Sequence, residues 1–326
     1  MKKKILIIGA EGYIGKVVSN YLSQKKYRIN AIDNFTYGTR HFLKQKKNKN
    51  YKLFKGSMSD LNLLKKASKD IDVVVMLAGL VGDPITKKYF KKAKKANEEY
   101  VDKVISFFSK QKVEKFIFIS TCSNYGLVKH GNLLSENYPL SPKSHYAKSK
   151  VKIEKRLLSL KTKNMNSIIL RFATAFGMSQ RMRFDLTINE FVRDLLFFKK
   201  LTVYDANTWR PYCHVKDFAR AIHKIILTDV NKVRNQVFNV GDSSNNFTKK
   251  MIVNKITKKL KNNKVEFLQN SVDPRNYKVN FSKINNVLRF KCKYSVNFGI
   301  NEIIQYLKNN KSLIKKTKEM GNYKIK

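Results

Sequence analysis

Acidic residues, cysteines and long apolar runs are scarce in this sequence. Its 326 residues include 23 Asp and Glu against 68 Lys and Arg, which gives a formal charge of +45. The cysteines, Cys122, Cys213 and Cys292, are an odd number without metal-ligand spacing, so a disulfide framework is excluded and a reducing compartment is favoured. No apolar run approaches the ~20 residues that cross a bilayer. We therefore expect a soluble, cytoplasmic protein with no metal centre and no membrane partner.

The excess of positive charge raises the question of a nucleic-acid partner. Lys outnumbers Arg by 56 to 12, and the lysines lie in nearly every segment, often with Asn beside them. Aromatic residues fall mostly in apolar runs, whereas a surface that stacks on bases interleaves them with basic residues. We therefore interpret the lysines as solvated and predict no nucleic-acid partner. Nucleic-acid binding is kept as an alternative, which requires an affinity that falls steeply with salt.

The first fifteen residues carry the motif around which the chain is organised. An apolar run at residues 4–8 leads into Gly9, Gly12 and Gly15, and a helical pattern follows at residues 14–22. A strand, a glycine loop and a helix in this order form a dinucleotide site, in which a diphosphate meets free N–H groups at the helix N-terminus. The glycine spacing departs from GxGxxG, so a glycine-rich turn of another α/β protein is the alternative.

Short apolar strands and helical segments alternate along the first half of the chain. A Lys-rich helix is expected within residues 87–110, and the last dozen residues are expected to be a loose tail. The alternation predicts an α/β fold with a Rossmann-like doubly wound parallel sheet. After the first strand, the expected strands are residues 28–33, 51–55, 72–77 and 115–120.

Asp33 ends the second expected strand, roughly twenty residues after the glycine loop. A carboxylate at this position accepts hydrogen bonds from the ribose hydroxyls of adenosine and repels a 2′-phosphate. The sequence therefore predicts that NAD is favoured over NADP.

A hydroxyl-rich strand end and a Tyr–Lys pair follow the fifth strand. Thr121 lies at the expected carboxyl edge of the sheet, and Tyr146 and Lys150, four residues apart, project from one helical face. A phenol has an ordinary pKa near 10, too high for a base at neutral pH. An ammonium group and a nicotinamide cation nearby lower such a pKa. We therefore predict that Tyr146 is a general base and that Lys150 lowers its pKa and binds the cofactor ribose.

These motifs resemble those of the extended short-chain dehydrogenase/reductases, in the group of NAD-dependent nucleotide-sugar epimerases and dehydratases. The resemblance extends from Gly9 to about Leu307. It implies NAD as cofactor, a catalytic triad of Thr121, Tyr146 and Lys150, and a homodimer formed through helices near residues 97–109 and 146–160. The residues that it assigns to NAD, besides Tyr146 and Lys150, are Gly9, Gly12, Tyr13, Ile14, Gly15, Asp33, Asn34, Ser57, Met58, Leu77, Ala78 and Gly79.

Several stretches of the second half resemble the group's substrate-binding part, which implies a nucleotide-diphosphate sugar as substrate. They are residues 170–177, 181–186, 209–217 and 273–275. Arg210 and Arg275 would bind the diphosphate, a role that suits bidentate guanidinium contacts, with a surface ion pair as the alternative for each. The residues assigned to the substrate are Val81, Ser123, Thr174, Arg181, Asn189, Arg210 and Arg275.

The resemblance also implies two interleaved domains. Residues 1–172 with 207–240 are expected to form the NAD-binding domain. Residues 173–206 with 241–326 are expected to form a smaller α/β domain that binds the nucleotide sugar.

Departures from the group's pattern narrow the expected reaction. Dehydratases of the group place Asp and Glu after the catalytic Thr, where this chain has Cys122 and Ser123, so elimination is not expected. Val81 stands where some 4-epimerases carry Lys, and structural roles are favoured for Cys122 and His145. We predict a nucleotide-sugar 4-epimerase that oxidises the sugar C4 hydroxyl by hydride transfer to NAD. The alternatives are a 4-dehydrogenase, for example of a heptose nucleotide, that releases the keto sugar, and an NAD-sensing binding protein.

Overall fold

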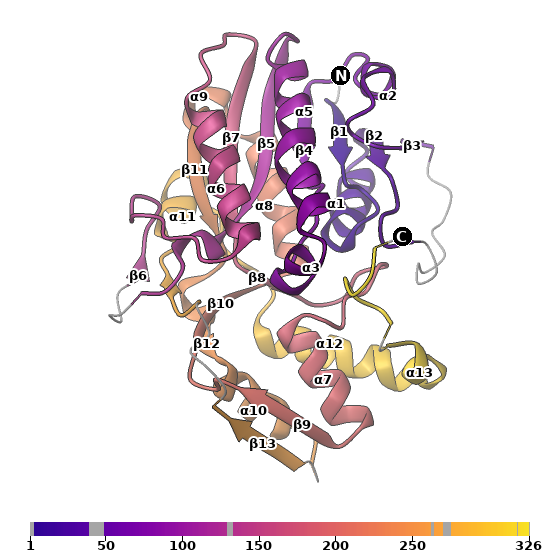
Figure 1. The fold of residues 1–326 in the computed structure, drawn as a ribbon, viewed down its shortest axis with the longest axis vertical. Coiled ribbons are helices and arrows are strands. Elements are labelled where there is room, and N and C mark those ends of the chain that lie inside the picture. The colour runs from indigo at the N-terminus through magenta and orange to yellow at the C-terminus, as the bar shows by residue number, and fades with distance from the viewer. Residues whose placement is uncertain are drawn as a thin grey trace.

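A seven-stranded parallel sheet forms the centre of the upper part of the molecule (Figure 1). The computed structural model describes residues 3–38, 49–128, 133–261, 264–269, 275–317 and 319–325. Neighbouring strands of this sheet pair in parallel, which confirms the predicted doubly wound fold. In spatial order the strands are β11 (Gln236–Val240), β7 (Met165–Phe172), β5 (Val113–Thr121), β4 (Val73–Met76), β1 (Lys4–Ile8), β2 (Arg28–Asp33) and β3 (Tyr51–Lys55).

The strand order reverses direction between β1 and β4. From β1 the chain continues outward to β2 and β3, whereas β4, β5 and β7 follow on the other side. Ligands of open α/β sheets bind at such a switch point, outside the carboxyl ends of the strands. The topology therefore places a site beyond the ends of β1 and β4.

Helices cover both faces of the sheet, and the strands supply side chains to each face alternately. Ile5 and Ile7 of β1 belong to one buried cluster, and Leu6 and Ile8 to the other, as the two-residue period of a strand requires. The first cluster lies under α1 (Tyr13–Gln24), α8 (Val215–Leu227) and α11 (Ser282–Leu288). The second lies under α2 (Leu61–Ala67), α5 (Tyr100–Phe108) and α6 (His145–Leu158), of which α5 and α6 stand in front of the sheet in Figure 1.

The helix predicted within residues 87–110 is longer and less regular than expected. It begins at α3 (Asp83–Lys88), resumes as α4 (Phe90–Lys94), and passes through a π-helical turn at Lys95–Glu99 into α5. The π turn carries the buried Asn97, whose amide donates to Leu80 O at 2.9 Å and accepts from Leu80 N at 2.7 Å. This irregular turn fixes the loop after β4, in keeping with the frequent occurrence of π turns at functional sites.

The lower part of the molecule has a buried cluster of its own, formed largely by α7 (Thr187–Phe197), α10 (Lys249–Thr257) and α12 (Val296–Asn309). Its strands are β9 (Lys200–Tyr204) paired with β13 (Lys264–Leu268), and β8 (Thr174–Phe176), β10 (Trp209–His214) and β12 (Asn246–Thr248) in a three-stranded sheet. The division into an NAD-binding domain (residues 1–172 with 207–240) and a substrate-binding domain (residues 173–206 with 241–326) stays a proposal. The remaining short elements are 3-10 turns at Cys122–Tyr125, Ser243–Asn245 and Lys311–Leu313, β6 (Leu133–Leu134), β14 (Lys278–Val279), α9 (Val230–Val233) and α13 (Ile314–Thr317).

The expectation of a loose C-terminal tail is wrong. After α13, residues 319–325 run back toward the large sheet (Figure 1). Met320 is 4% exposed, and its carbonyl oxygen accepts a hydrogen bond from Phe184 N at 2.7 Å. The ordered packing of this segment could not be predicted from the sequence, because one buried Met (Met320) and one buried Asn (Asn322) in a basic segment produce no helical or strand periodicity.

Candidate active site

The glycine loop connects β1 to α1, and two of its glycines are required by the protein's own packing. Gly9 has a φ of +88°, and a Cβ there would lie 2.6 Å from Ala78 N. A Cβ at Gly15 would lie 2.1 Å from Gly9 O. At Gly12, however, a Cβ would meet only Gly9 O, at an ordinary 3.5 Å. Space for a side chain at Gly12, next to the N-terminus of α1, is what the close approach of a diphosphate to the backbone requires.

Asp33 is fixed beside the glycine loop by two backbone donors. Its carboxylate accepts hydrogen bonds from Glu11 N at 2.9 Å and from Phe35 N at 2.8 Å. Burial raises the pKa of Asp33, and these two donors oppose the rise. The arrangement joins the end of β2 to the loop after β1, as a site for an adenosine ribose does.

A cavity of about 1330 Å³ runs from the glycine loop past the ends of β4 and β5 into the lower part of the molecule. Every residue that the resemblance assigns to NAD lines it, and so do Thr121, Tyr146 and Lys150. Of the residues assigned to the substrate, six line it: Val81, Ser123, Thr174, Arg181, Arg210 and Arg275. The chain thus brings the predicted cofactor, catalytic and substrate residues around one space.

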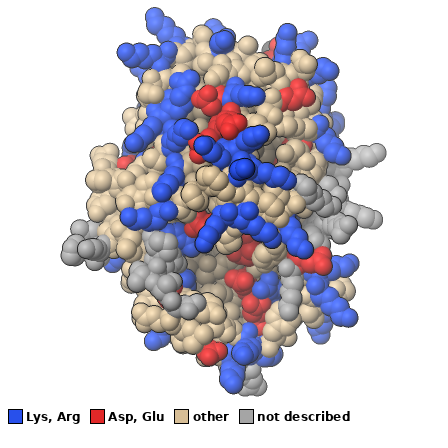
Figure 2. Space-filling view, in the orientation of Figure 1, with Lys and Arg blue, Asp and Glu red and all other residues tan. Residues whose placement is uncertain are grey.

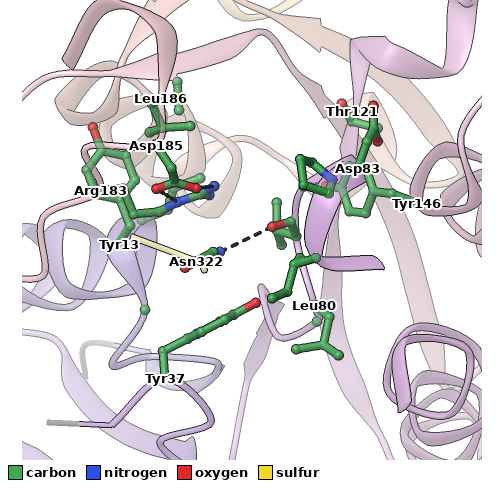
Figure 3. A pocket seen from close by; sticks show the side chains of 18 of the residues that line it. Tyr13, Tyr37, Leu80, Asp83, Thr121, Tyr146, Arg183, Asp185, Leu186 and Asn322 are labelled. Carbon is green, nitrogen blue, oxygen red and sulfur yellow. Dashed lines mark hydrogen bonds and ion pairs between the residues drawn. The ribbon is translucent and has the colours of Figure 1, made fainter. Parts of the chain in front are cut away.

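Tyr146 and Lys150 lie on the first turns of α6, next to the end of β5. Lys150 is 4% exposed; its ammonium donates to Ile119 O at 2.7 Å and lies 5.8 Å from the centre of the Tyr146 ring. Thr121 ends β5, and its hydroxyl accepts from Ser123 N at 3.1 Å. In Figure 3, Thr121 and Tyr146 line the same side of the cavity. Hydroxyl, phenol and ammonium groups therefore meet where the sequence predicts a catalytic triad.

The predicted lowering of the pKa of Tyr146 is not seen in the protein alone. Burial raises this pKa, and the positive charge of Arg183 opposes the rise only in part. Burial also lowers the pKa of Lys150 to about 8, although the carboxylate of Glu154 works in the opposite direction. Desolvation is the largest cause of both shifts, since Lys150 is buried and Tyr146 is only partly exposed, in the cavity wall.

A buried network that sequence reasoning missed supports the end of β5, where the catalytic Thr121 is predicted. Glu154 forms a bidentate ion pair with Arg171, with Nη2 to Oε2 at 2.7 Å and Nε to Oε1 at 3.2 Å. Glu154 also accepts hydrogen bonds from Ser120 Oγ at 2.5 Å and Asn124 Nδ2 at 2.8 Å. An available signal was the i, i+4 spacing of Lys150 and Glu154, which places both on one helical face.

Three residues singled out from the sequence have structural contacts. Asn189, assigned to the substrate, does not line the cavity: its amide accepts from Gly177 N at 3.0 Å and donates to Tyr13 Oη at 3.3 Å. Cys122 is buried and donates to Arg171 O at 3.3 Å. His145 lies against Phe90, with ring centres 4.6 Å apart. The substrate role predicted for Asn189 is therefore replaced by one in connecting the glycine loop to the segment before α7.

The two arginines expected to bind a diphosphate differ in their surroundings. Arg210 is 6% exposed, and its guanidinium lies 5.4 Å from the centre of the Tyr277 ring. Arg275 forms an ion pair with Asp83 at 3.0 Å. Residues 273 and 274 of the predicted phosphate-binding segment lie outside the described residues.

Comparison with known proteins decides the family. The sequence model of the NAD dependent epimerase/dehydratase family matches residues 5–241. The chain belongs to this family. It is 27% identical to an uncharacterised protein of Methanocaldococcus jannaschii, over 95% of this chain and 97% of that one. It is 24% identical to the UDP-glucose 4-epimerase of Bacillus subtilis, over 73% of this chain and 76% of that one.

Among solved structures, the chain resembles the dTDP-glucose 4,6-dehydratase of Bacillus anthracis in complex with NAD. The identity is 26% and the TM-score 0.84, over 97% of this chain and 99% of that one. This member of the epimerase/dehydratase family is therefore an enzyme, and its cofactor is NAD. The open space at Gly12 and the fixed carboxylate of Asp33 fit that cofactor.

Other features bear on the possible partners of the enzyme. Lys and Arg are spread over much of the face in Figure 2, with acidic and uncharged residues between them, and the surface is hollowed near its middle. In the part of the chain that the structure describes, no helix has both the length and the apolar character needed to cross a membrane. The same part contains no cluster of three or more His, Cys, Asp or Glu side chains suited to a metal ion.

Proposed function

We propose that this enzyme is an NAD-dependent nucleotide-sugar 4-epimerase. The observation that carries the proposal is the single cavity in which Thr121, Tyr146 and Lys150 lie between the glycine loop and Arg210. A sugar bound beside Tyr146 with its diphosphate at Arg210 would present a ring hydroxyl to the catalytic residues. Bound NAD supplies the chemistry of accepting and returning a hydride.

The catalytic residues have separate proposed roles. Tyr146 takes the proton of the C4 hydroxyl at its phenol oxygen and returns a proton when the ketone is reduced. Thr121 hydrogen-bonds the same sugar oxygen and holds it in line. Lys150, with a pKa of about 8, is largely charged at neutral pH, so its ammonium favours the phenolate form of Tyr146.

Elimination of water is disfavoured by the residues after Thr121. Cys122 points into the core, and burial raises the pKa of its thiol. Ser123 lines the cavity, but its hydroxyl is too weakly acidic to exchange protons readily near neutral pH. The similarity to a 4,6-dehydratase therefore supports a common fold and cofactor, but it does not support elimination of water as the reaction of this enzyme. The second candidate remains a 4-dehydrogenase that releases the keto sugar.

The substrate assignment rests on two further guanidinium groups that line the cavity, those of Arg210 and Arg275. The buried Arg210 would bind the diphosphate directly. The side chain of Arg275 is 35% exposed and paired with Asp83, so water screens its charge more than that of Arg210, and we give it the smaller share of the affinity. Val81, Ser123 and Thr174 line the intervening wall, where we expect the sugar to contact them.

We further propose a homodimer formed through α5 and α6. The two helices lie side by side, joined by Arg156 and Asp102 at 3.1 Å, and α6 also contacts the π-helical turn before α5 through Ser149 and Glu98 at 2.8 Å. Leu158 and Phe90, on α6 and on the neighbouring α4, are 45% and 44% exposed. Sedimentation of the wild type and of Leu158→Glu tests this surface. We expect a dimer for the wild type and a monomer for the variant. If Leu158→Glu were also a dimer, the subunits would contact each other through another surface.

The reaction is tested by incubating the enzyme with NAD and a panel of UDP- and dTDP-hexoses. Proton NMR of the sugar and the absorbance of NADH are followed together. A 4-epimerase forms the C4 epimer without accumulating NADH, whereas a 4-dehydrogenase forms one NADH for each keto sugar. Absence of both products from every sugar would contradict the proposed function, provided that the same preparation binds NAD.

A further inference from the structure

A buried guanidinium in the cavity has no acidic partner within the described residues. Arg181 is 7% exposed; it donates to Asn322 Oδ1 at 2.7 Å and to Gly321 O at 3.4 Å, and its guanidinium lies 4.7 Å from the centre of the Tyr37 ring. None of the described carboxylates forms an ion pair with it. The neighbouring Arg183, by contrast, is paired with Asp185 at 2.6 Å.

The charge of Arg181 is costly in this position. Burial and the charge of Arg183 lower the pKa of Arg181 to about 10, so it still carries its charge at neutral pH. A buried charge is normally compensated by an opposite charge. Asp185 and Asp33 act on Arg181 only without direct contact. Because Arg181 lines the cavity and its hydrogen bonds go to neutral oxygens, a bound anion would compensate its charge directly.

The position of Arg181 identifies which anion. Ser179 Oγ donates to the carbonyl oxygen of Tyr13, the first residue of α1, at 2.7 Å and accepts from Arg181 N at 3.2 Å. The segment that carries Arg181 is therefore joined to the N-terminus of α1. Tyr37, under the guanidinium, belongs to the loop after Asp33. Both contacts place the cation beside the glycine loop, where the diphosphate of NAD is expected.

The C-terminal segment holds Arg181 from the opposite wall. Asn322 is 8% exposed; while its Oδ1 accepts from Arg181, its Nδ2 donates to Val81 O, in the loop after β4, at 3.2 Å. Figure 3 shows Asn322 between Arg183 and Asp185 on one side and the wall of the loop after β4 on the other, with Tyr37 close by. Asn322 thus connects the segment before α7 to the large sheet across the cavity.

We propose that Arg181, positioned by Asn322, binds the diphosphate of NAD, and that residues 319–323 close the cavity over the cofactor. Arg181, which the resemblance assigns to the sugar nucleotide, would then bind the cofactor instead. A bound NAD would be contacted by backbone N–H groups on the sheet side and by a guanidinium on the other side. The inference rests on NAD binding, which family membership shows, and not on the 4-epimerase reaction.

The test measures cofactor binding without turnover. NAD⁺ and UDP are titrated calorimetrically, at one salt concentration, into the wild type, Arg181→Gln, Arg181→Lys and Arg210→Ala. Loss of a charge-assisted hydrogen bond should weaken NAD⁺ binding to Arg181→Gln by about ten- to a hundredfold, with UDP affinity unchanged and partial recovery in Arg181→Lys. Arg210→Ala should show the opposite pattern.

The closing role is tested separately by the rate at which NADH leaves the enzyme, followed by its fluorescence. Asn322→Ala should release NADH at least about three- to tenfold faster, as expected when the neutral hydrogen bond to Val81 O is lost together with the contact to Arg181. Lys324→Ala, an exposed change in the same segment, should release it at the wild-type rate. Circular dichroism and unchanged UDP affinity establish that the variants are folded.

Two results would overturn the proposal. If Arg181→Gln lost affinity for UDP and kept it for NAD⁺, Arg181 would belong to the substrate, as the resemblance implies. If Asn322→Ala and Lys324→Ala released NADH equally fast, the C-terminal segment would not close the cofactor site. The Asn322 measurement decides the matter if Arg181→Gln fails to fold.

Discussion

The two ends of the cavity are constructed from different parts of the chain. The cofactor end consists mainly of backbone and small residues, with Gly9, Gly12 and Gly15 around the N-terminus of α1. The end where we propose that the substrate binds presents long side chains, above all Arg210 and Arg275, the second of which is held by Asp83. A site made of backbone N–H groups tolerates few substitutions, and it recognises the diphosphate that all dinucleotides share. A site made of side chains can change its ligand specificity through single substitutions. The cofactor of this enzyme is accordingly easier to infer than its sugar.

Tyr146→Phe tests whether the two ends serve one reaction, and we expect the largest effect from it. Removing the proposed general base should lower turnover by about 10² to 10⁴-fold. NAD⁺ and UDP should bind as before, since neither end of the cavity is altered. Steady-state kinetics and calorimetry check both statements. Near full activity on the true substrate would disprove the assignment of the base.

Glu154→Gln probes the buried network behind the end of β5. The substitution leaves the buried guanidinium of Arg171 without its counter-ion, which typically costs about 3–5 kcal/mol of folding free energy. Urea denaturation measures the loss. Replacing both residues, as in Glu154→Gln with Arg171→Met, should recover much of it, because no unpaired charge then remains. A double variant less stable than Glu154→Gln would contradict this account of the pair.

Glu302→Gln tests how much a partly buried carboxylate contributes to folding stability in the lower part of the molecule. Burial would raise the pKa of Glu302, but hydrogen bonds from His214, at 3.0 Å, and from Lys216 lower it to about 2, below its ordinary 4.5. A carboxyl group with a lowered folded-state pKa stabilises the fold above its ordinary pKa, and this contribution disappears as the pH falls from about 4.5 to 2. Glu302→Gln should therefore cost at most about 3 kcal/mol at pH 7 and almost nothing near pH 2. Denaturation of both proteins across this range checks the trend, and a difference independent of pH would contradict it.

Arg210→Ala tests the side-chain end directly. We expect UDP to bind about ten- to a hundredfold more weakly, because a charge-assisted contact is worth about 1.5–3 kcal/mol. Arg275→Ala should have a smaller effect, since the side chain of Arg275 is 35% exposed and paired with Asp83. Equal losses in the two variants would show that this exposure and pairing do not reduce the contribution of Arg275.

The smallest effect is expected from the surface lysines. Lys91→Gln with Lys94→Gln changes two exposed residues of α4 and should leave UDP and NAD⁺ affinities within about twofold, because exposed charges are screened by salt. Calorimetry at the same salt concentration as for Arg210→Ala gives the comparison. If UDP affinity fell as much as in Arg210→Ala, binding would depend on the diffuse positive charge of the surface and not on a direct contact of Arg210 with the diphosphate.

The features predicted from the sequence are those that short stretches determine. The strands around the glycine loop and the Tyr146–Lys150 pair follow from apolar periodicity and fixed offsets. The contacts of Asn322 do not, because they join residues 141 and 241 positions apart, at Arg181 and Val81. The rise in the pKa of Tyr146 in the protein alone was also not predicted, because a sequence shows which charges lie near along a helix but not how far folding removes water from the phenol. The lowering predicted in the presence of bound NAD stays a prediction.

The central claim is that oxidation and reduction of the same sugar carbon occur in this one cavity. The most direct measurement uses a nucleotide sugar with deuterium at C4, incubated in ordinary water with the enzyme and NAD, followed by NMR and mass spectrometry of the products. The account predicts a C4 epimer that retains its deuterium at C4, with no labelled cofactor released. A 4-keto product with the deuterium in free NADH, or loss of the label to water, would contradict it.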